Sequence, residues 1–544
     1  MNAPTAPPPG SDRRPPSAVR AAVALAVLGA LVAGLPVVLG PGDLIFPDAM
    51  EYADMARGLA RGDGLLDRAV WPYQLSFSAE APAPAVRRAP GFPWGQALVF
   101  KGFGPSDRAA RAAGAFFFWL CGGLVFLLVL RLGRAGVPLP GGAASAPQVA
   151  FIASFLVLFD PGLLLYGTAG LSEPLFTAAL LVIALALTAD PFPGRWMLAG
   201  FLAGSSQLIR LNGFTLIASI LAAAWPAGEG VRWRRLLAVL IGAAPPLGWL
   251  ALRNHSAVGD LSFLGPNGAI VFNELGGLPP HGIERRMFLP PASPPTWAWV
   301  FEGRLDEFLL KAWRGLEKNL SAAAMGASPL AAGASLFYGA ARWPSMPAPV
   351  RALWILLTVS GAVWIGLFAV GEFEGPRFFT PLAPLALVLT LIACCDMCGT
   401  DGLRARGSRL GLGFVLLALT LPGVFRLAQL LERPREPSFG RVLGSLLEQS
   451  TPAEAVILAD VPWAVAWFGD RTAVWLPLRV DEVEALRERA GATHLLLTPA
   501  TASDGEIEPR WREIYFGERQ PPSNWRALAG LDFGGSIHLF SLGP

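Results

Sequence analysis

The acidic segment that follows the first long apolar stretch of the chain carries side chains that could perform chemistry. Asp48, Glu51 and Tyr52 lie within about one helical turn of each other in the sequence PDAMEY. A positioned carboxylate can orient or deprotonate a hydroxyl or an amine. Asp48 and Glu51 are therefore the candidate catalytic residues, and Tyr52 is a candidate substrate contact. The sequence RRAPGFPW continues the same loop at residues 87–94.

Further ionisable residues lie within or beside the apolar stretches and share one predicted face of the membrane. A charged side chain at the centre of a membrane helix costs about 2.5 to 3.5 kcal/mol, so such residues mark functional sites. Carboxylates and arginines on one face suit a substrate with an anionic phosphate and a nucleophile that must lose a proton. The candidates are Arg210, Arg377 and Arg253 for the phosphate, Asp160 and Glu173 for the substrate, and Glu372 and Glu374 without an assigned role.

The elements that would position these side chains are membrane helices. Hydrophobic residues make up 53% of the 544 residues and charged residues 15%, and the mean hydropathy is +0.48. A soluble domain carries about a quarter charged residues. Apolar runs of about 18 to 22 residues are long enough to cross a hydrocarbon core of roughly 30 Å. The composition therefore predicts a mainly α fold, a polytopic transmembrane helical bundle.

About eleven membrane helices are expected, give or take two, with two long loops at residues 41–108 and 253–318. The eighth segment has the weakest apolar character of the eleven, because it is rich in Ala, Gly and Ser. The expected segments are 19–40, 109–132, 148–159, 171–188, 196–209, 213–225, 236–252, 319–341, 351–370, a run that ends near 397, and 410–430.

Short arginine-rich loops orient this bundle, because they favour the cytoplasmic side. Alternation from a cytoplasmic N-terminus places the arginines at 131–134, 195, 232–235, 342–351 and 404–409 inside. Both long loops and the C-terminus then lie outside. The candidate site is therefore expected on the extracytoplasmic face of a bacterial inner membrane. An even number of helices would contradict this topology.

The two ends of the chain differ from the bundle. Residues 1–18 are rich in proline and are expected to form a disordered cytoplasmic N-terminus. The arginines there resemble the start of a signal peptide, but the apolar run after them is long and no clear cleavage site follows, so a retained helix is expected. From residue 437 on, helical and strand-like runs alternate, which predicts a small extracytoplasmic α/β domain over 437–544.

Several other chemistries lack their sequence signatures. Neither GxxxxGK[ST] nor GxGxxG after a strand occurs, so a nucleotide-driven enzyme is disfavoured. The four histidines are scattered, and Cys395 and Cys398 have no second cysteine pair, so no cofactor is assigned. The carboxylates could hold a divalent cation, although nothing fixes one. The net charge of +3 gives no reason to expect a nucleic acid as a partner.

An ordered set of motifs connects the candidate residues. The first outer loop has the form D-x-x-x-Y-x-x-x-A-x-x-L-x-x-G-x-G, from Asp48 to Gly64, and is closed by PGFP at 90–93. The later motifs are Ser172-Glu173-Pro174-Leu175, Arg210, Trp249 with Arg253-Asn254, and Arg377-Phe378 before Pro381 and Pro384. In this order the chain resembles the GT-C superfamily of membrane glycosyltransferases over about residues 20–430. The most similar branch is that of the protein mannosyltransferases and aminoarabinose transferases, of the family 39 type.

The resemblance implies a GT-C-like bundle and a transferase that moves a hexose or pentose from a polyprenyl-phosphate-linked donor, with inversion, to an extracytoplasmic acceptor. It places the catalytic carboxylate at Asp48. Protein mannosyltransferases carry an adjacent acidic partner, whereas Ala49 follows Asp48 here. Glu51 could replace that partner only in part, so a protein hydroxyl is not favoured over a lipid or glycan acceptor.

Structural roles compete with the functional ones. Asp48 and Glu51 have the spacing of a capping box, and Asp160 and Glu173 stand beside prolines where helices or turns begin. Tyr52 can pack at the membrane interface, and the arginines can reach lipid headgroups. For the whole chain, one alternative is a transporter or flippase for a lipid-linked sugar, which predicts an internal repeat. The other is a non-catalytic envelope assembly protein that binds lipid.

Overall fold

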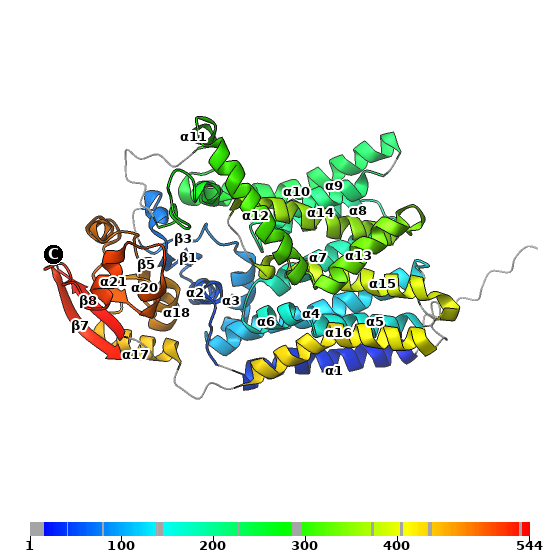
Figure 1. The fold of residues 1–544 in the computed structure, drawn as a ribbon, viewed down its shortest axis with the longest axis horizontal. Helices are drawn as coiled ribbons and strands as arrows, with labels where there is room; N and C mark the ends of the chain where they lie inside the picture. The colour runs from blue at the N-terminus through cyan, green and yellow to red at the C-terminus, as the bar shows by residue number, and fades with distance from the viewer. Residues whose placement is uncertain are drawn as a thin grey trace, which may run out of the picture.

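The computed structural model shows a helical bundle with a small sheet at one end (Figure 1). It describes residues 16–543 except 41, 79–80, 138, 140–144, 227, 286–295, 372–374, 403–405, 433–437 and 533–535. Most of the expected disordered N-terminus lies outside the described residues. Glu372, Glu374 and the side chain of Cys398 lie outside them as well.

All eleven expected apolar segments are helical, and the eighth is divided between two helices. The helices of the bundle are α1 (Pro16–Leu39), α4 (Asp107–Arg134), α5 (Ala146–Leu158), α6 (Pro161–Thr168), α7 (Glu173–Leu187), α8 (Arg195–Ser206), α9 (Leu216–Ala224), α10 (Glu229–Val258), α12 (Leu305–Gly326), α13 (Pro329–Arg342), α14 (Ala348–Gly371), α15 (Ala383–Gly402) and α16 (Arg406–Leu431). Helices α1 and α16 run side by side along one edge of the bundle (Figure 1).

Within the described residues, six helices are long and apolar enough to cross a membrane, or up to eight if each of two bent pairs forms one span. The bent pairs are α5 with α6, at 62°, and α12 with the segment from Pro329, at 98°. The number by length and composition is therefore lower than eleven. The physical reason is that α7, α8 and α9 are short, with 15, 12 and 9 residues, and that the eighth segment breaks at Ser328.

Helices α8 and α10 show how the bundle aligns candidate residues. A Cβ at Gly200 would lie 2.1 Å from the Val239 carbonyl, and one at Gly242 would lie 2.0 Å from the Met197 carbonyl, so only glycines allow this close approach. A Cβ at Gly204 would in turn lie 2.7 Å from the Ala243 carbonyl, so the contacts advance from Gly200 and Val239 to Gly204 and Ala243, as in two parallel helices. Their C-terminal ends, which lead to Arg210 and contain Arg253, therefore lie at the same face of the bundle.

The first long loop contains α2 (Pro47–Arg61), β1 (Leu66–Asp67), β2 (Ala69–Val70), η1 (Pro72–Ser76), β3 (Ala83–Pro84) and α3 (Gly91–Phe103). Helix α2 has Phe46 at its N-cap, without a side-chain hydrogen bond. The capping box considered for Asp48 and Glu51 is therefore not formed. Helix α3 begins at Gly91, where a Cβ would lie 2.7 Å from the Leu208 carbonyl. The glycine of PGFP thus brings this loop against the segment that carries Arg210.

A six-stranded sheet lies beyond the bundle, with the strand order β2-β5-β4-β6-β8-β7. The first four strands are parallel, and β8 and β7 are antiparallel. The C-terminal elements are α17 (Phe439–Ser450), β4 (Val456–Ala459), α18 (Pro462–Gly469), β5 (Thr472–Trp475), η8 (Val480–Glu482), α19 (Val483–Ala490), β6 (His494–Leu497), α20 (Pro499–Ser503), α21 (Pro509–Tyr515), β7 (Trp525–Asp532) and β8 (Ser536–Leu542).

Strand β2 belongs to the first loop, yet it pairs with β5 through Ala69–Ala473 and Val70–Val474. Figure 1 shows α2 between the bundle and this sheet. Since one sheet cannot lie on both sides of a membrane, the first loop and the C-terminal segment are on the same side. The expected topology has this property, because ten crossings were expected between the two segments, whereas a total of six or eight spans would leave an odd number between them.

Candidate functional site

Asp48 lies in the first turn of α2, where its carboxylate meets two arginines from other segments. Its Oδ1 accepts a hydrogen bond from Arg88, which follows β3, and its Oδ2 accepts one from Arg377 in the short helix η6 (Pro376–Phe378). The Asp48 side chain is 17% exposed, and those of Arg88 and Arg377 are 21% and 20% exposed. This carboxylate is therefore both ion-paired and accessible to a ligand.

Glu51 lies one turn further along α2 and faces two arginines, but it is buried. Its Oε2 accepts a hydrogen bond from Arg88 Nε at 2.6 Å, and its Oε1 lies 2.5 Å from Arg87 Nη2. Trp71 Nε1 donates to the same Oε1 at 3.3 Å, and the Arg87 guanidinium lies 4.0 Å from the centre of the Trp71 ring. Glu51 therefore holds two arginines in place and presents no free carboxylate.

Glu173, the first residue of α7, is a second buried carboxylate. Its Oε1 accepts hydrogen bonds from Arg210 Nη1 at 2.7 Å and from Arg377 Nε at 2.5 Å. Arg210 also donates to Ser172 Oγ at 3.2 Å, and the Tyr52 hydroxyl lies 3.3 Å from the same Oγ. Glu173 therefore joins the phosphate-binding candidates to the segment that holds Tyr52.

Six of the residues expected from the sequence thus form one connected group, together with two arginines that the sequence analysis did not assign. We call this group the Asp48 cluster: Asp48, Glu51, Tyr52, Arg87, Arg88, Glu173, Arg210 and Arg377. Asp67, whose Oδ2 lies 3.6 Å from Arg87 Nε, adjoins it. With Asp67, the four carboxylates balance the four arginines in number.

The charges of this group shift the pKa values of its carboxyl groups. Burial alone would raise the pKa of Asp48, but the charges of Arg88 and Arg377 outweigh burial and hold that pKa well below its usual range. Burial raises the pKa of Asp67 to about 6, although Arg87 opposes the shift and Glu51 adds to it. Asp48 is therefore ionised at any physiological pH, whereas Asp67 gains a proton under mildly acidic conditions.

Two supports fix the arginines beside Asp48. Arg253, at the end of α10, donates to the Ala85 carbonyl, just ahead of Arg88. Among the described residues it makes no ion pair with a carboxylate, so it supports the backbone of the loop. On the other side, a Cβ at Gly326 of α12 would lie 2.1 Å from the Pro376 carbonyl, so α12 packs tightly against the helix that carries Arg377.

Asp160 has a separate place in the structure. It is buried at the N-cap of α6, where its Oδ1 accepts a hydrogen bond from the Leu163 N–H at 2.8 Å. It makes no ion pair with any residue that the structure describes. Asp160 therefore serves here as a helix cap, the structural role that the neighbouring proline suggested.

The sequence analysis missed Arg87, Arg88, Asp67 and Trp71. A signal existed for the arginines, because they are adjacent and directly precede the PGFP sequence in the loop that begins with Asp48. Trp71 had no such signal. Its place depends on the pairing of β2 with β5, which brings the Trp475 ring to 4.6 Å from the Trp71 ring.

The divalent cation considered from the sequence does not fit this arrangement. No group of three or more His, Cys, Asp or Glu side chains within the described ranges could hold a metal ion. The oxygens of Asp48 and Glu51 face guanidinium groups, which a cation would have to displace. The arginines therefore occupy the place that a metal would need.

Comparison with known proteins finds no matching protein-family model and no matching curated protein. Among solved structures, the chain is similar to ArnT from Cupriavidus metallidurans bound to undecaprenyl phosphate, with 13% sequence identity and a TM-score of 0.56. The match covers 97% of this chain and 99% of the ArnT chain. ArnT in the apo state matches over the same shares with 15% identity and a TM-score of 0.52.

The archaeal oligosaccharyltransferase AglB from Archaeoglobus fulgidus, in complex with an inhibitory peptide and a dolichol-phosphate, is also similar. Its identity is 13% and its TM-score 0.53, over 96% of this chain and 74% of its own. These identities are low, so the likeness establishes the fold. The shared portion includes both the bundle and the C-terminal sheet. With its apolar helices, this chain is an integral membrane protein with the fold of the GT-C glycosyltransferases.

Proposed function

We propose that the protein is a membrane glycosyltransferase that moves a sugar from a polyprenyl-phosphate-linked donor to an extracytoplasmic acceptor, with inversion at the anomeric carbon. One observation carries the proposal: an accessible, ionised carboxylate lies between two arginines with unused N–H donors. Nη1 of Arg88 and Nη1 of Arg377 donate to no atom of the described residues. A general base and phosphate-binding groups therefore meet beside Asp48.

The solved relatives support the class of donor. The ArnT structure holds undecaprenyl phosphate, and the AglB structure holds a dolichol-phosphate. We infer a lipid phosphate of the same class for this chain. The transferred group is a hexose or pentose, and the acceptor is a lipid, a glycan or a protein. The proposed location is the bacterial inner membrane, with the Asp48 cluster at its extracytoplasmic face.

We assign the binding of the donor phosphate to Arg88 and Arg377. Arg210 shares Glu173 with Arg377 and supports it. In Arg377, Nε and Nη2 stay bound to Glu173 and Asp48, so the guanidinium is already oriented before the ligand arrives. Its Nη1 is left for the phosphate. A charged donor in a fixed orientation binds phosphate oxygens strongly.

The other residues considered from the sequence support this arrangement. Arg253 is no longer assigned to the phosphate, because its guanidinium is bound to the Ala85 carbonyl. Tyr52 is buried, and its hydroxyl meets Ser172, so we assign it the positioning of the segment beside Arg210. Each of these contacts fixes the backbone on which an arginine of the site is carried.

Asp48 accepts the proton of the acceptor hydroxyl or amine as that oxygen or nitrogen attacks the anomeric carbon. A glycosidic bond forms, the bond between the anomeric carbon and the phosphate oxygen breaks, and its electron pair leaves with the polyprenyl phosphate. Arg88 and Arg377 stabilise the charge of this leaving group, so it needs no proton. One accessible carboxylate is therefore sufficient, while Glu51 and Glu173 orient the arginines.

Asp48→Asn tests the proposal in a deletion strain complemented with wild-type or variant protein. Comparison of envelope lipids and glycans with and without the gene identifies the donor and the acceptor, and the same product measures transfer. Loss of a general base lowers a rate by about 10²- to 10⁴-fold. We therefore expect the product to disappear in Asp48→Asn while the amount of folded protein is unchanged.

Asp63→Asn is the matched control, because Asp63 is an exposed acid just after α2. It should restore the product fully. Wild-type product levels in the Asp48→Asn strain would refute the assignment.

A further inference from the structure

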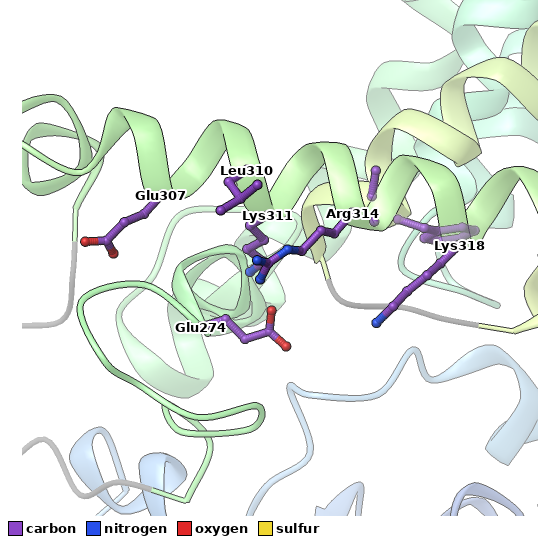
Figure 2. A pocket seen from close by; sticks show the side chains of 9 residues that line it. Glu274, Glu307, Leu310, Lys311, Arg314 and Lys318 are labelled. Carbon is purple, nitrogen blue, oxygen red and sulfur yellow. The ribbon is translucent and has the colours of Figure 1, made fainter.

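A cavity of about 530 Å³ lies outside the Asp48 cluster, along helix α12 at the end of the second long loop. This volume is in the range that holds small ligands. Figure 2 shows that charged side chains of α12 reach it from one side and Glu274, on the facing loop, from the other. Its charged lining residues are Glu274, Glu307, Lys311, Arg314 and Lys318.

Helix α12 has a charged face and an apolar face. The three cations of the cavity follow the spacing i, i+3 and i+7, which places them on one side of the helix. The opposite side exposes Leu305, Leu309 and Trp313, by 45%, 58% and 66%. An exposed apolar stripe with a tryptophan on a membrane protein lies against lipid at the membrane interface. The cavity is therefore placed where a lipid headgroup meets the protein.

Arg314 is the cation best able to bind a ligand there. Its side chain is exposed and makes no hydrogen bond or ion pair with the described residues. Lys311, by contrast, is buried and donates to the carbonyls of Val271 at 3.1 Å and Asn273 at 2.7 Å. An anion beside Arg314 would also gain from the nearby charge of Lys311.

Glu274 adds an acidic side chain to the cavity, opposite the cations of α12. Its backbone has a φ of 61°, in the left-handed region, and its exposed side chain is directed toward Lys311 and Arg314 (Figure 2). An acidic group at this place can accept a hydrogen bond from a hydroxyl or an ammonium group. A ligand that carries such a group beside its phosphate matches both sides of the cavity.

We propose that this cavity binds the phosphate of a membrane-lipid headgroup, with a hydroxyl or ammonium group of the same headgroup at Glu274. The site is separate from the donor phosphate assigned to Arg88 and Arg377. Leu310, which is 50% exposed, and Phe368 line the cavity beside the cations, which favours an amphiphile over free phosphate.

Helix α12 connects this cavity to the Asp48 cluster. From Lys318 the helix continues for eight residues, about 12 Å, to Gly326, which packs against Pro376 next to Arg377. A lipid held at Arg314 therefore steadies the helix that supports the assigned donor-phosphate site. Lipid binding should stabilise the folded protein measurably.

The test uses the full-length protein in detergent and short-chain phosphatidylglycerol, with binding followed by native mass spectrometry and thermal unfolding. We expect wild-type protein to bind the lipid and Arg314→Gln to bind it about tenfold more weakly, the size expected for one charge-assisted hydrogen bond. Arg314→Gln should fold normally, because Arg314 has no partner in the described structure to lose. The matched control is Arg108→Gln, an exposed arginine at the start of α4.

Two further probes identify the ligand. Glycerol 3-phosphate tests whether a soluble phosphate without acyl chains binds at the same place. If Arg314→Gln binds both glycerol 3-phosphate and phosphatidylglycerol more weakly, the cavity recognises the phosphate itself. If it binds only phosphatidylglycerol more weakly, the ligand comes from the membrane. Glu274→Gln should weaken the binding of phosphatidylglycerol, whose headgroup has free hydroxyls, more than the binding of phosphatidic acid, whose headgroup has no glycerol hydroxyls. Lipid binding by Arg314→Gln equal to wild type, or an equal loss in Arg108→Gln, would overturn the proposal.

Discussion

Helix α2 carries two carboxylate–arginine groups, and they differ in how completely their charges are used. The Asp48 cluster lies at its N-terminal end. Further along the helix, Asp54 accepts hydrogen bonds from Arg57 at 2.6 Å and from Arg68 at 2.5 Å, and Arg68 also pairs with Asp470 at 2.7 Å. We call these last four residues the Asp54 cluster.

The Asp54 cluster joins the first loop to the C-terminal segment. The Asp54 side chain is only 2% exposed, and Arg57 also donates to the carbonyls of Ala466 and Trp467 in α18. In the Asp48 cluster, by contrast, the acid is accessible and two arginines retain unused donors. Both groups contain buried acids and arginines, so charge alone does not distinguish them. Accessibility and unused donors distinguish a candidate site from a structural joint.

Asp54→Asn should show the largest effect on stability. Without this carboxylate, Arg57 and Arg68 have only Asp470 as a shared acidic partner. Breaking a buried ion pair destabilises a protein by about 3 to 5 kcal/mol. We therefore expect a clearly lower unfolding temperature and faster proteolysis of the C-terminal segment, measured on the purified protein.

The comparison variant is Asp48→Asn, which should keep nearly the wild-type unfolding temperature. Its arginines keep other partners, because Arg88 still pairs with Glu51 and Arg377 with Glu173. Equal destabilisation of the two variants would show that the Asp48 cluster is a structural joint as well.

Arg88→Gln should reduce activity with a smaller effect on stability. It removes one of two cations beside Asp48 and one assigned phosphate donor, while Glu51 keeps Arg87. A hydrogen bond to a charged group contributes about 1.5 to 3 kcal/mol, so kcat/KM should fall about 10- to 100-fold. The loss of positive charge also raises the pKa of Asp48. As the pH is lowered, the variant should therefore lose activity at a higher pH than wild type does.

A pH profile of transfer by Arg88→Gln and wild type measures both effects. Arg61→Gln is the control, because Arg61 is an exposed arginine of α2 that pairs with Asp470 at 3.0 Å. An unchanged acid limb in Arg88→Gln would contradict the role assigned to its charge.

Local patterns were sufficient to predict much of the fold. Apolar runs located the bundle helices, and the alternating runs after residue 437 predicted β4, β5 and β6 with the helices between them. The grouping of Glu173, Arg210 and Arg377 with Asp48 followed from topology, because these residues border apolar segments on one predicted face. That prediction needed no knowledge of contacts, only the side of the membrane.

The rest depended on contacts between distant segments. Strand β2 has two residues, too few to predict, and its partner β5 lies about 400 positions later. The burial of Glu51 depends on Arg87, Arg88 and Trp71, so its spacing from Asp48 alone could not separate a catalytic acid from a supporting one. Arg253 was assigned to the phosphate because of its motif. Its hydrogen bond to the Ala85 carbonyl depends on how the first loop packs against α10, which the motif does not indicate.

Asp67→Asn probes the least compensated acid beside the Asp48 cluster, and its expected effect is the smallest. In the folded protein the pKa of Asp67 is about 6, raised by burial, whereas an unfolded Asp has a pKa of about 3.9. Between about pH 4 and pH 6 the folded state binds more protons than the unfolded state. Wild-type protein therefore loses stability as the pH rises through this window.

Asparagine has no such titration, so the unfolding temperature of Asp67→Asn relative to wild type should rise from pH 4 to pH 6 and level off above about pH 7. Thermal unfolding across this range, with Asp63→Asn as an exposed control that shows no such rise, measures it. A constant difference between Asp67→Asn and wild type would mean that Arg87 compensates Asp67 fully. Among Asp67 and the three acids of the Asp48 cluster, Asp48 would then be the one whose charge is open to a ligand.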